Sequence, residues 1–331
     1  MFPQEITSTL TTIFKRDTRS IVVFLQGPPG IGKTAAVGQA ALGVGKTLMT
    51  FALPTCESVD LRGLPTVANG MTQWASPLPR DGAGVLLLDE VSSAAPDVQV
   101  AVHHLVHAEP GSDMSLPAGW HLVLTGNRAS DKTHYRATSG PLRNRMVIIN
   151  AEPDLKQWCE WAMDNRISPI ITGFVRWRPE LLMAKEIPGE GAFPSPRSWE
   201  AVSNILALGT SVSIEREMIH GTIGEGASIE FEAYLRTARD LPAIESILAE
   251  QGKAQVPKLP DQLYALVTSL AQYTRERKES AMKYVSRMPV EFALLYVMDV
   301  RRDGHYDIRK DKEIGRWITE HSKLFETEEA A

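Results

Sequence analysis

The chain has 331 residues, 43% of them hydrophobic and 23% charged, with a formal net charge of −5. This is the composition of a folded globular protein, and it excludes a disordered or fibrous chain. The slightly acidic balance offers no basic stripe for phosphate backbones, so nucleic acid is not the expected partner.

The start of the chain lacks the basic flank and apolar run that a signal peptide needs. The longest apolar runs, at residues 21–25 and 85–88, are far shorter than the roughly 20 residues that span a bilayer. Cys56 and Cys159 lie far apart without CxxC spacing, which argues against a disulfide framework and against a zinc site. We therefore predict a soluble, cytoplasmic protein without membrane attachment.

Short apolar runs alternate with helical stretches from about residue 20 to residue 151. This alternation predicts a parallel sheet covered by helices. Each expected strand has apolar residues on both faces, as buried parallel strands require. The five expected strands are 21–26, 47–53, 84–88, 121–125 and 146–150.

A glycine-rich segment directly follows the first expected strand and precedes a helical stretch. It fits the GxxxxGK[ST] pattern, in which backbone N–H groups and the positive helix end surround phosphate oxygens. Lys33 is expected to hold the β- and γ-phosphates, and the hydroxyl of Thr34 to ligate Mg²⁺. We predict that ATP and Mg²⁺ bind here. The segment, called the phosphate loop below, is Gly27, Pro28, Pro29, Gly30, Ile31, Gly32, Lys33 and Thr34.

Two adjacent acids, Asp89 and Glu90, end the expected strand 84–88. Asp89 is expected to bind Mg²⁺ together with Thr34. Because alternate residues of an extended strand point in opposite directions, Glu90 is free to orient and deprotonate the attacking water. Asn127 follows the next strand, where its carboxamide could fix that water or could simply form a turn.

After Pro153 the strand pattern disappears, and apolar residues recur at helical spacing, for example in 154–164, 198–208 and 228–237. A Pro-, Lys- and Gln-bearing stretch, 251–261, separates this helical part from a final one. We predict a nucleotide-binding core at 1–152, an all-helical lid at 153–245 and a C-terminal helical extension at 246–331.

Together these motifs resemble the AAA+ ATPases, and among them the MoxR-like branch that includes the rubisco and nitric-oxide-reductase activator proteins. The resemblance covers roughly residues 18–240 and implies a P-loop NTPase αβα sandwich with a five-stranded parallel sheet. It is carried by the segments GPPGIGKT, ESVDLRGLP, GVLLLDE, LPAGWHLVLTGNR, GPLRNRMVIINAEPD and FPSPRSWEAVSNIL.

The resemblance also implies roles for three residues. Asn127 is similar to the polar sensor-1 residue, and Arg197 to the sensor-2 arginine at a helix start. Arg145 stands where the family places the arginine that reaches the γ-phosphate held by the neighbouring subunit. Arg143 is the alternative, because Met146 replaces the Phe that many relatives carry next to this arginine.

In the family, loops between the second and third strands often contact the partner from a central pore. The candidates here are Leu61, Arg62, Leu64 and Trp74, although Arg62 may close a turn and Trp74 may belong to the core. His103, His104 and His107 include a pair spaced for a metal, but no acidic or Cys partner completes a ligand set. Helix packing or a subunit contact is the expected role of these histidines.

Three functions remain. The resemblance implies an ATP-hydrolysing homo-oligomer, a hexameric ring, that remodels or activates a protein client, which in relatives is often a protein with a von Willebrand A domain. The second is a nucleic-acid motor or helicase loader, for which a basic or aromatic surface is missing. The third is a nucleotide-dependent switch or small-molecule kinase, but no NKxD motif follows Asn127.

Overall fold

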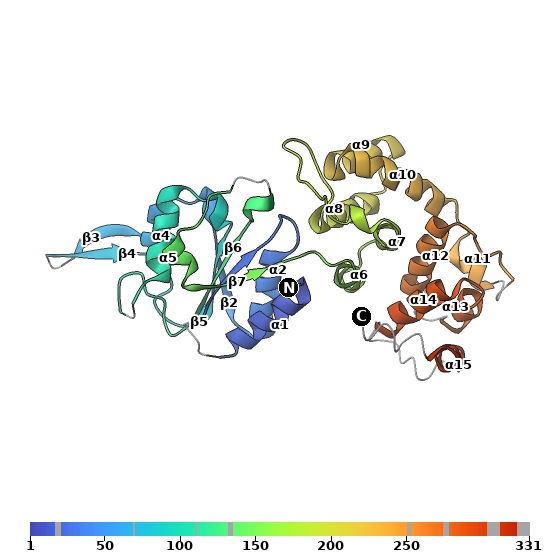
Figure 1. Ribbon diagram of the computed structural model, residues 1–331, viewed down its shortest axis with the longest axis horizontal. Helices are drawn as coiled ribbons and strands as arrows, with labels where there is room; N and C mark the ends of the chain where they lie inside the picture. The colour runs from blue at the N-terminus through green and yellow to red at the C-terminus, as the bar shows by residue number, and fades with distance from the viewer. Residues whose placement is uncertain are drawn as a thin grey trace. The chain divides into compact units, whose positions relative to one another are not determined.

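The computed structural model describes residues 1–16, 21–68, 70–109, 111–131, 135–249, 253–273, 278–302 and 312–322. It divides into two compact units (Figure 1). Unit 1 consists of Met1–Gln157, Lys185–Gly189 and Ser195–Arg197, and unit 2 contains the rest of the chain. The finer division at residues 152 and 245 stays a prediction.

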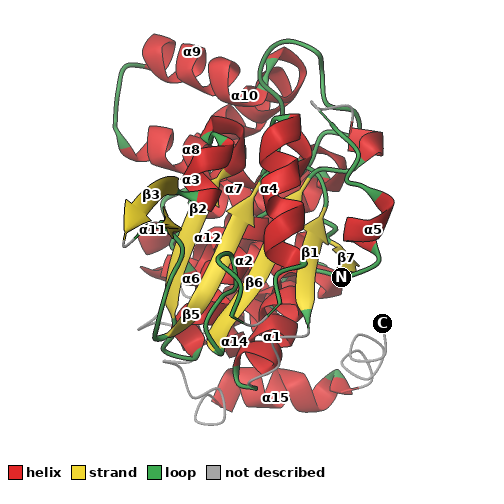
Figure 2. Ribbon diagram, turned by 90° about the vertical axis from the view of Figure 1, so that its left-hand side faces the viewer, coloured by secondary structure: helices red, strands yellow, loops and turns green. Residues whose placement is uncertain are grey.

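Unit 1 contains a five-stranded sheet in the order β2-β5-β6-β1-β7. Every neighbouring pair in it is parallel, and the arrows of β5, β6 and β1 in Figure 2 point the same way. The α/β fold class and all five expected strands are therefore confirmed. The strands are β1 (Val22–Gln26), β2 (Thr47–Ala52), β5 (Ala83–Asp89), β6 (Gly119–Gly126) and β7 (Met146–Asn150).

The three inner strands are buried, but the two outer strands are not. In β2 Leu48 is 36% exposed, and in β7 Val147 and Ile148 are 49% and 41% exposed. The expectation that all five strands are buried on both faces is wrong for β2 and β7. An outer strand has a neighbouring strand on one side only, so its apolar side chains stay partly open to solvent.

Helices cover the sheet. Leu86 and Leu88 of β5 share a core cluster with Val98 and Val102 of α4 (Pro96–Val106). Because alternate strand residues point to opposite faces, the residues between them face the other layer. On that side α2 (Lys33–Gly43) contacts β5 and α1 (Pro3–Phe14). Unit 1 also contains two short helices, α3 (Ser58–Arg62) and α5 (Gly140–Arg143).

An antiparallel hairpin, β3 (Leu64–Ala68) and β4 (Met71–Ala75), interrupts the chain between β2 and β5. The sequence pattern did not predict it. Figure 1 shows it projecting from the end of unit 1. Leu64, Val67 and Met71 on this hairpin are 61%, 80% and 65% exposed. The hairpin therefore adds an apolar projection to unit 1 rather than a sixth strand to its sheet.

After β7 every regular element among the described residues is a helix, as the sequence predicts. No described helix is both long and apolar enough to cross a membrane. The helices are α6 (Leu155–Asp164), α7 (Pro169–Trp177), α8 (Pro196–Ala207), α9 (Val212–Ile223), α10 (Glu225–Arg239), α11 (Ile244–Ala249), α12 (Pro260–Tyr273), α13 (Lys278–Val285), α14 (Val290–Arg302) and α15 (Lys312–Glu320).

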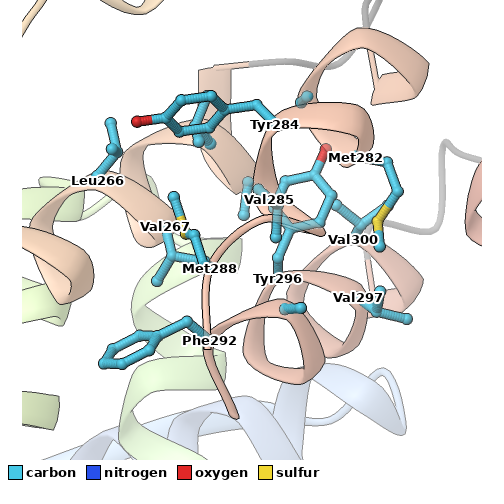
Figure 3. Packing of buried hydrophobic residues seen from close by; sticks show 14 of the residues in the cluster. Leu266, Val267, Met282, Tyr284, Val285, Met288, Phe292, Tyr296, Val297 and Val300 are labelled. Atoms are coloured by element: carbon cyan, nitrogen blue, oxygen red, sulfur yellow. The ribbon is translucent and has the colours of Figure 1, made fainter. Parts of the chain in front are cut away.

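Unit 2 has its own apolar core. Figure 3 shows Tyr284 and Val285 of α13 beside Tyr296 and Val297 of α14, all of them buried. The same unit holds a buried ion pair, in which Arg176 of α7 donates two hydrogen bonds of 2.7 Å to the Asp299 carboxylate of α14. Removing one partner of such a pair would leave an uncompensated buried charge, so the pair ties α7 to α14.

Candidate nucleotide site

The phosphate loop connects β1 to the first residue of α2. A Cβ on Gly27 would lie 2.5 Å from the carbonyl oxygen of Ala151, so only glycine lets these two backbones approach. Gly32 is the N-cap of α2 and has a φ of 93°, a left-handed conformation that favours glycine. Local backbone geometry therefore accounts for both glycines that the sequence pattern fixes.

Lys33 lies inside this loop. Its Nζ donates hydrogen bonds to the carbonyl oxygens of Gly27 and Pro28, at 2.6 and 2.9 Å, and to Asn127 Oδ1 at 3.3 Å. Burial lowers the pKa of Lys33 to about 8, although the carboxylates of Asp131, Asp89 and Glu90 act in the opposite direction. The ammonium group is thus partly desolvated, which strengthens its attraction for an anion.

Thr34 and Asp89 meet at the carboxyl end of the sheet. The Thr34 hydroxyl lies 3.1 and 3.0 Å from the two carboxylate oxygens of Asp89. Thr34 is the second residue of α2 and Asp89 is the last residue of β5, so the fold joins two motifs that are 55 residues apart. Hydroxyl and carboxylate oxygens are the hard ligands that Mg²⁺ prefers, so this donor set fits the metal that the sequence predicts.

Glu90 follows β5 directly, with φ 60° and ψ 42°. The sequence argument assumed that Glu90 continues the extended strand and points away from Asp89 by alternation. That assumption is wrong, because β5 ends at Asp89 and the backbone of Glu90 turns into the left-handed region. The backbone N–H of Glu90 donates a 3.0 Å hydrogen bond to the hydroxyl of Thr125 on β6.

Asn127 follows β6 and is 7% exposed. Its backbone N–H donates to the Ser92 hydroxyl at 2.8 Å, and its side chain accepts the bond from Lys33. The structure therefore brings Asn127 to the phosphate loop, as expected.

Sequence reasoning missed three polar residues at this end of the sheet: Ser92, Thr125 and Asp131. All three are buried. Asp131 is the carboxylate that opposes the lowering of the Lys33 pKa most strongly. In a sequence, a Ser or Thr inside an apolar strand or turn looks like an ordinary packing residue. Only the hydrogen bonds in the structure show which polar groups it contacts. The acidic character of Asp131 was the one available signal.

Arg197 also lies beside the phosphate loop. Its backbone N–H, in the first turn of α8, donates a 3.1 Å hydrogen bond to the carbonyl oxygen of Gly30. Its side chain is exposed. Burial is the main cause of the lowered pKa of Lys33, and the positive charge of Arg197 adds a smaller effect in the same direction.

Arg145 and Arg143 stand at the opposite end of the sheet. Val22 pairs with Met146 and Gln26 with Asn150, so Arg145 precedes β7 beside the start of β1, whereas the phosphate loop follows the end of β1. The intervening strand is roughly 17 Å long at about 3.3 Å per residue. Both arginines are exposed, and neither forms an ion pair with a residue in the described part of the chain.

His103 and His104 lie on α4, and His107 is its C-cap. The rings of His103 and His107 stack with centroids 3.9 Å apart. Burial lowers the pKa of His103, and His107, His104 and Arg145 act in the same direction. No group of three or more metal-ligating side chains occurs among the described residues. Arg145, a candidate subunit-contact residue, is therefore near enough to His103 to act on its charge.

Some candidates for partner contact are buried and others are exposed. Leu61 is 0% exposed and belongs to the core of unit 1, so it is not available for contact. Arg62 is exposed and lies over the half-buried ring of Trp74, 5.2 Å from its centroid. Leu64 is 61% exposed on the hairpin. Exposure thus leaves Arg62 and the hairpin as the candidates for partner contact.

Comparisons with known proteins match part of the chain. Residues 22–148 match the family described as AAA domain (dynein-related subfamily). Protein NorQ of Paracoccus denitrificans (strain Pd 1222) is 40% identical over 117 residues, a match that covers 32% of this chain and 43% of NorQ. The matched part of the chain thus spans less than half the length of that relative.

Two solved structures of RuvB variants from Thermotoga maritima are also similar, each at 17% identity. The first has a TM-score of 0.39 and covers 86% of this chain and 85% of that chain. The second has a TM-score of 0.36 and covers 83% of each. Scores this low add nothing to the fold assigned from the sheet.

Proposed function

We propose that this chain, an AAA+ protein similar to the MoxR-like branch, hydrolyses ATP and uses the cycle to remodel or activate a protein partner. One observation carries the proposal. Lys33 contacts Asn127, and Thr34 contacts Asp89, at the single edge of the sheet where the phosphate loop lies. Three motifs far apart in the sequence thus converge where a nucleoside triphosphate would bind.

Each residue has a proposed role. The phosphate loop, Gly27 to Thr34, holds the phosphates through its N–H groups and Lys33. Thr34 and Asp89 hold Mg²⁺, which neutralises charge on the phosphate oxygens when bound. Glu90 orients and deprotonates the attacking water, and Asn127 fixes that water against the γ-phosphate.

The site is completed by a second copy of the chain. Arg145 lies a full strand away from the phosphate loop of its own sheet, so it serves a neighbouring subunit instead. An arginine supplied in trans stabilises the charge that develops during phosphoryl transfer. We therefore propose a homo-oligomer, a hexameric ring, in which Arg197 reports the nucleotide to a helical lid at residues 153–245, followed by the extension at 246–331.

The client is proposed to be a protein, for example one with a von Willebrand A domain. The exposed apolar residues Leu64, Val67 and Met71 of the β3–β4 hairpin supply a contact surface for a protein rather than for nucleic acid. Cys56 and Cys159 form no disulfide, which is consistent with a reducing compartment, and we place the protein in the cytoplasm.

Glu90→Gln tests the proposed reaction. Loss of the general base should slow steady-state ATP hydrolysis at least ~100-fold while ATP still binds. Phosphate release measures the first effect and a fluorescent ATP analogue the second. Near-normal turnover would remove Glu90 from the mechanism.

The same Glu90→Gln protein, held in ATP, tests the role of the cycle. A motor trapped with ATP should retain its client in a pull-down, and the wild-type protein in ADP is the matched control. Recovery of DNA in place of a protein would replace the remodelling function with a nucleic-acid motor.

A further inference from the structure

A buried hydroxyl joins the two acidic residues of the candidate site. Thr125 lies on β6 and is 0% exposed. Its Oγ1 lies 3.0 Å from the backbone nitrogen of Glu90 and also contacts Oδ1 of Asp89. A backbone N–H can only donate and an ionised carboxylate can only accept, so Thr125 accepts from Glu90 and donates to Asp89.

The first of these bonds acts on the backbone of Glu90. Among the described residues that are not glycine, only Glu90 and Arg166 have a positive φ. The left-handed conformation is unfavourable for a residue with a Cβ, and it persists only where its surroundings hold it. The bond from the Glu90 N–H to Thr125 is such a restraint, and it sets the direction in which the Glu90 side chain leaves the backbone.

The second bond acts on the carboxylate of Asp89. Thr34 approaches both of its oxygens from α2, while Thr125 approaches Oδ1 from β6. Two hydroxyls on different elements thus hold one carboxylate, so its orientation is fixed by α2 and β6 together. Loss of the Thr125 hydroxyl would free Asp89 on one side and Glu90 at its backbone at the same time.

We propose that Thr125 is a positioning residue for ATP hydrolysis. Its hydroxyl sets Asp89 for the metal and Glu90 for the attacking water, and it does not itself touch the nucleotide. This inference rests on the proposed ATPase function, because Asp89 and Glu90 have their assigned tasks only in that reaction.

Thr125→Val removes the hydroxyl and keeps the branched shape. Because small misplacements of catalytic groups can cost about 100-fold in rate, we expect single-turnover hydrolysis to fall ~100-fold. ADP affinity measured in EDTA should stay within about threefold, while the gain in ADP affinity on adding Mg²⁺ should shrink, since Asp89 is then held by Thr34 alone. Thr125→Ser keeps the hydroxyl and should restore both readouts to within a few-fold of wild type.

Thr138→Val is the matched control. Thr138 is also buried in unit 1, but its hydroxyl has no hydrogen-bond partner among the described residues. A merely structural role for Thr125 would lower activity and melting temperature together, would leave the Mg²⁺ dependence of ADP binding unchanged, and would overturn the proposal. If Thr125→Val does not fold, Thr125→Ala against Thr125→Ser makes the same comparison.

Failure of the proposed function gives a different result. If the wild-type protein binds ATP without cleaving it, the ATPase function fails. A smaller Mg²⁺-dependent gain in ADP affinity in Thr125→Val would then still support the positioning of Asp89. Wild-type hydrolysis with an unchanged Thr125→Val overturns the role of Thr125 alone.

Discussion

The two ends of the parallel sheet in unit 1 present their polar residues differently. At the carboxyl end, Lys33 bonds to Asn127 and Thr34 to Asp89, and these side chains are buried or half-buried. At the amino end of β7, Arg143 and Arg145 are exposed and form no ion pair with a described residue. The first end is assembled within one chain, whereas the arginines at the second end are open to solvent, as our proposal of a contact with a neighbouring subunit requires.

The largest effect on ATP turnover should come from the arginines at the amino end of β7. Arg145→Ala should lower kcat about 10³-fold, the lower range for an arginine supplied in trans, while ATP affinity stays nearly unchanged. The measurement is ATP turnover at saturating ATP. Arg143→Ala is the matched control, since it removes an equally exposed charge two residues away, and it should stay within about threefold of wild type. A large loss in Arg143→Ala with a small one in Arg145→Ala would exchange their roles.

Mixed oligomers separate a trans effect from a local one. Arg145→Ala subunits mixed with Lys33→Ala subunits should regain activity, because some interfaces then combine an intact Lys33 with an intact Arg145. Activity that never exceeds the sum of the two separate variants would place Arg145 in its own subunit's site, and the contrast between the two ends would disappear.

The same contrast explains what the sequence could predict. The phosphate loop, the five strands and the two acids at the end of β5 carry local patterns. In the phosphate loop, backbone geometry itself demands Gly27 and Gly32. The hairpin β3–β4 carries no such pattern, since its apolar residues are exposed. The position of Thr125 and the left-handed turn at Glu90 depend on a neighbouring strand, which a single segment does not encode.

A smaller effect is the pH dependence of ATP affinity, which should follow the titration of Lys33 at the carboxyl end of the sheet. The pKa of Lys33 is lowered from 10.5 to about 8, mainly by burial, so its ammonium is present below pH 8 and is lost above it. Since the phosphates bind the charged form, ATP affinity should be nearly constant below pH 7.5 and fall roughly tenfold between pH 7 and pH 9.

Fluorescent nucleotide titrations across this range measure the change. Arg145→Ala is the control, because loss of an exposed arginine should leave the profile in place. Affinity that stays constant to pH 9.5 would show that Lys33 keeps its proton and that its burial does not matter for binding.

The smallest effect concerns the rim of the carboxyl end. Arg128 pairs with Asp131, whose side chain is 6% exposed, and with Glu152, whose side chain is 46% exposed. Glu152→Gln removes only the exposed partner, so it should cost no more than about 1 kcal/mol in the free energy of unfolding. Asp131→Asn removes the buried partner and should cost more, about 2 kcal/mol, because Arg128 then loses its charge-assisted bonds away from water.

Urea unfolding of the two variants measures whether losing the buried partner of Arg128 costs more free energy of unfolding than losing the exposed one. Both substitutions remove one negative charge from a partner of the same arginine, so the net charge of the protein changes equally. If Glu152→Gln lowers the free energy of unfolding more than Asp131→Asn does, then the ion pair of Arg128 with Glu152, in the segment after β7, contributes more than its ion pair with the buried Asp131. The carboxyl end would then depend on that segment, and not only on its own buried contacts.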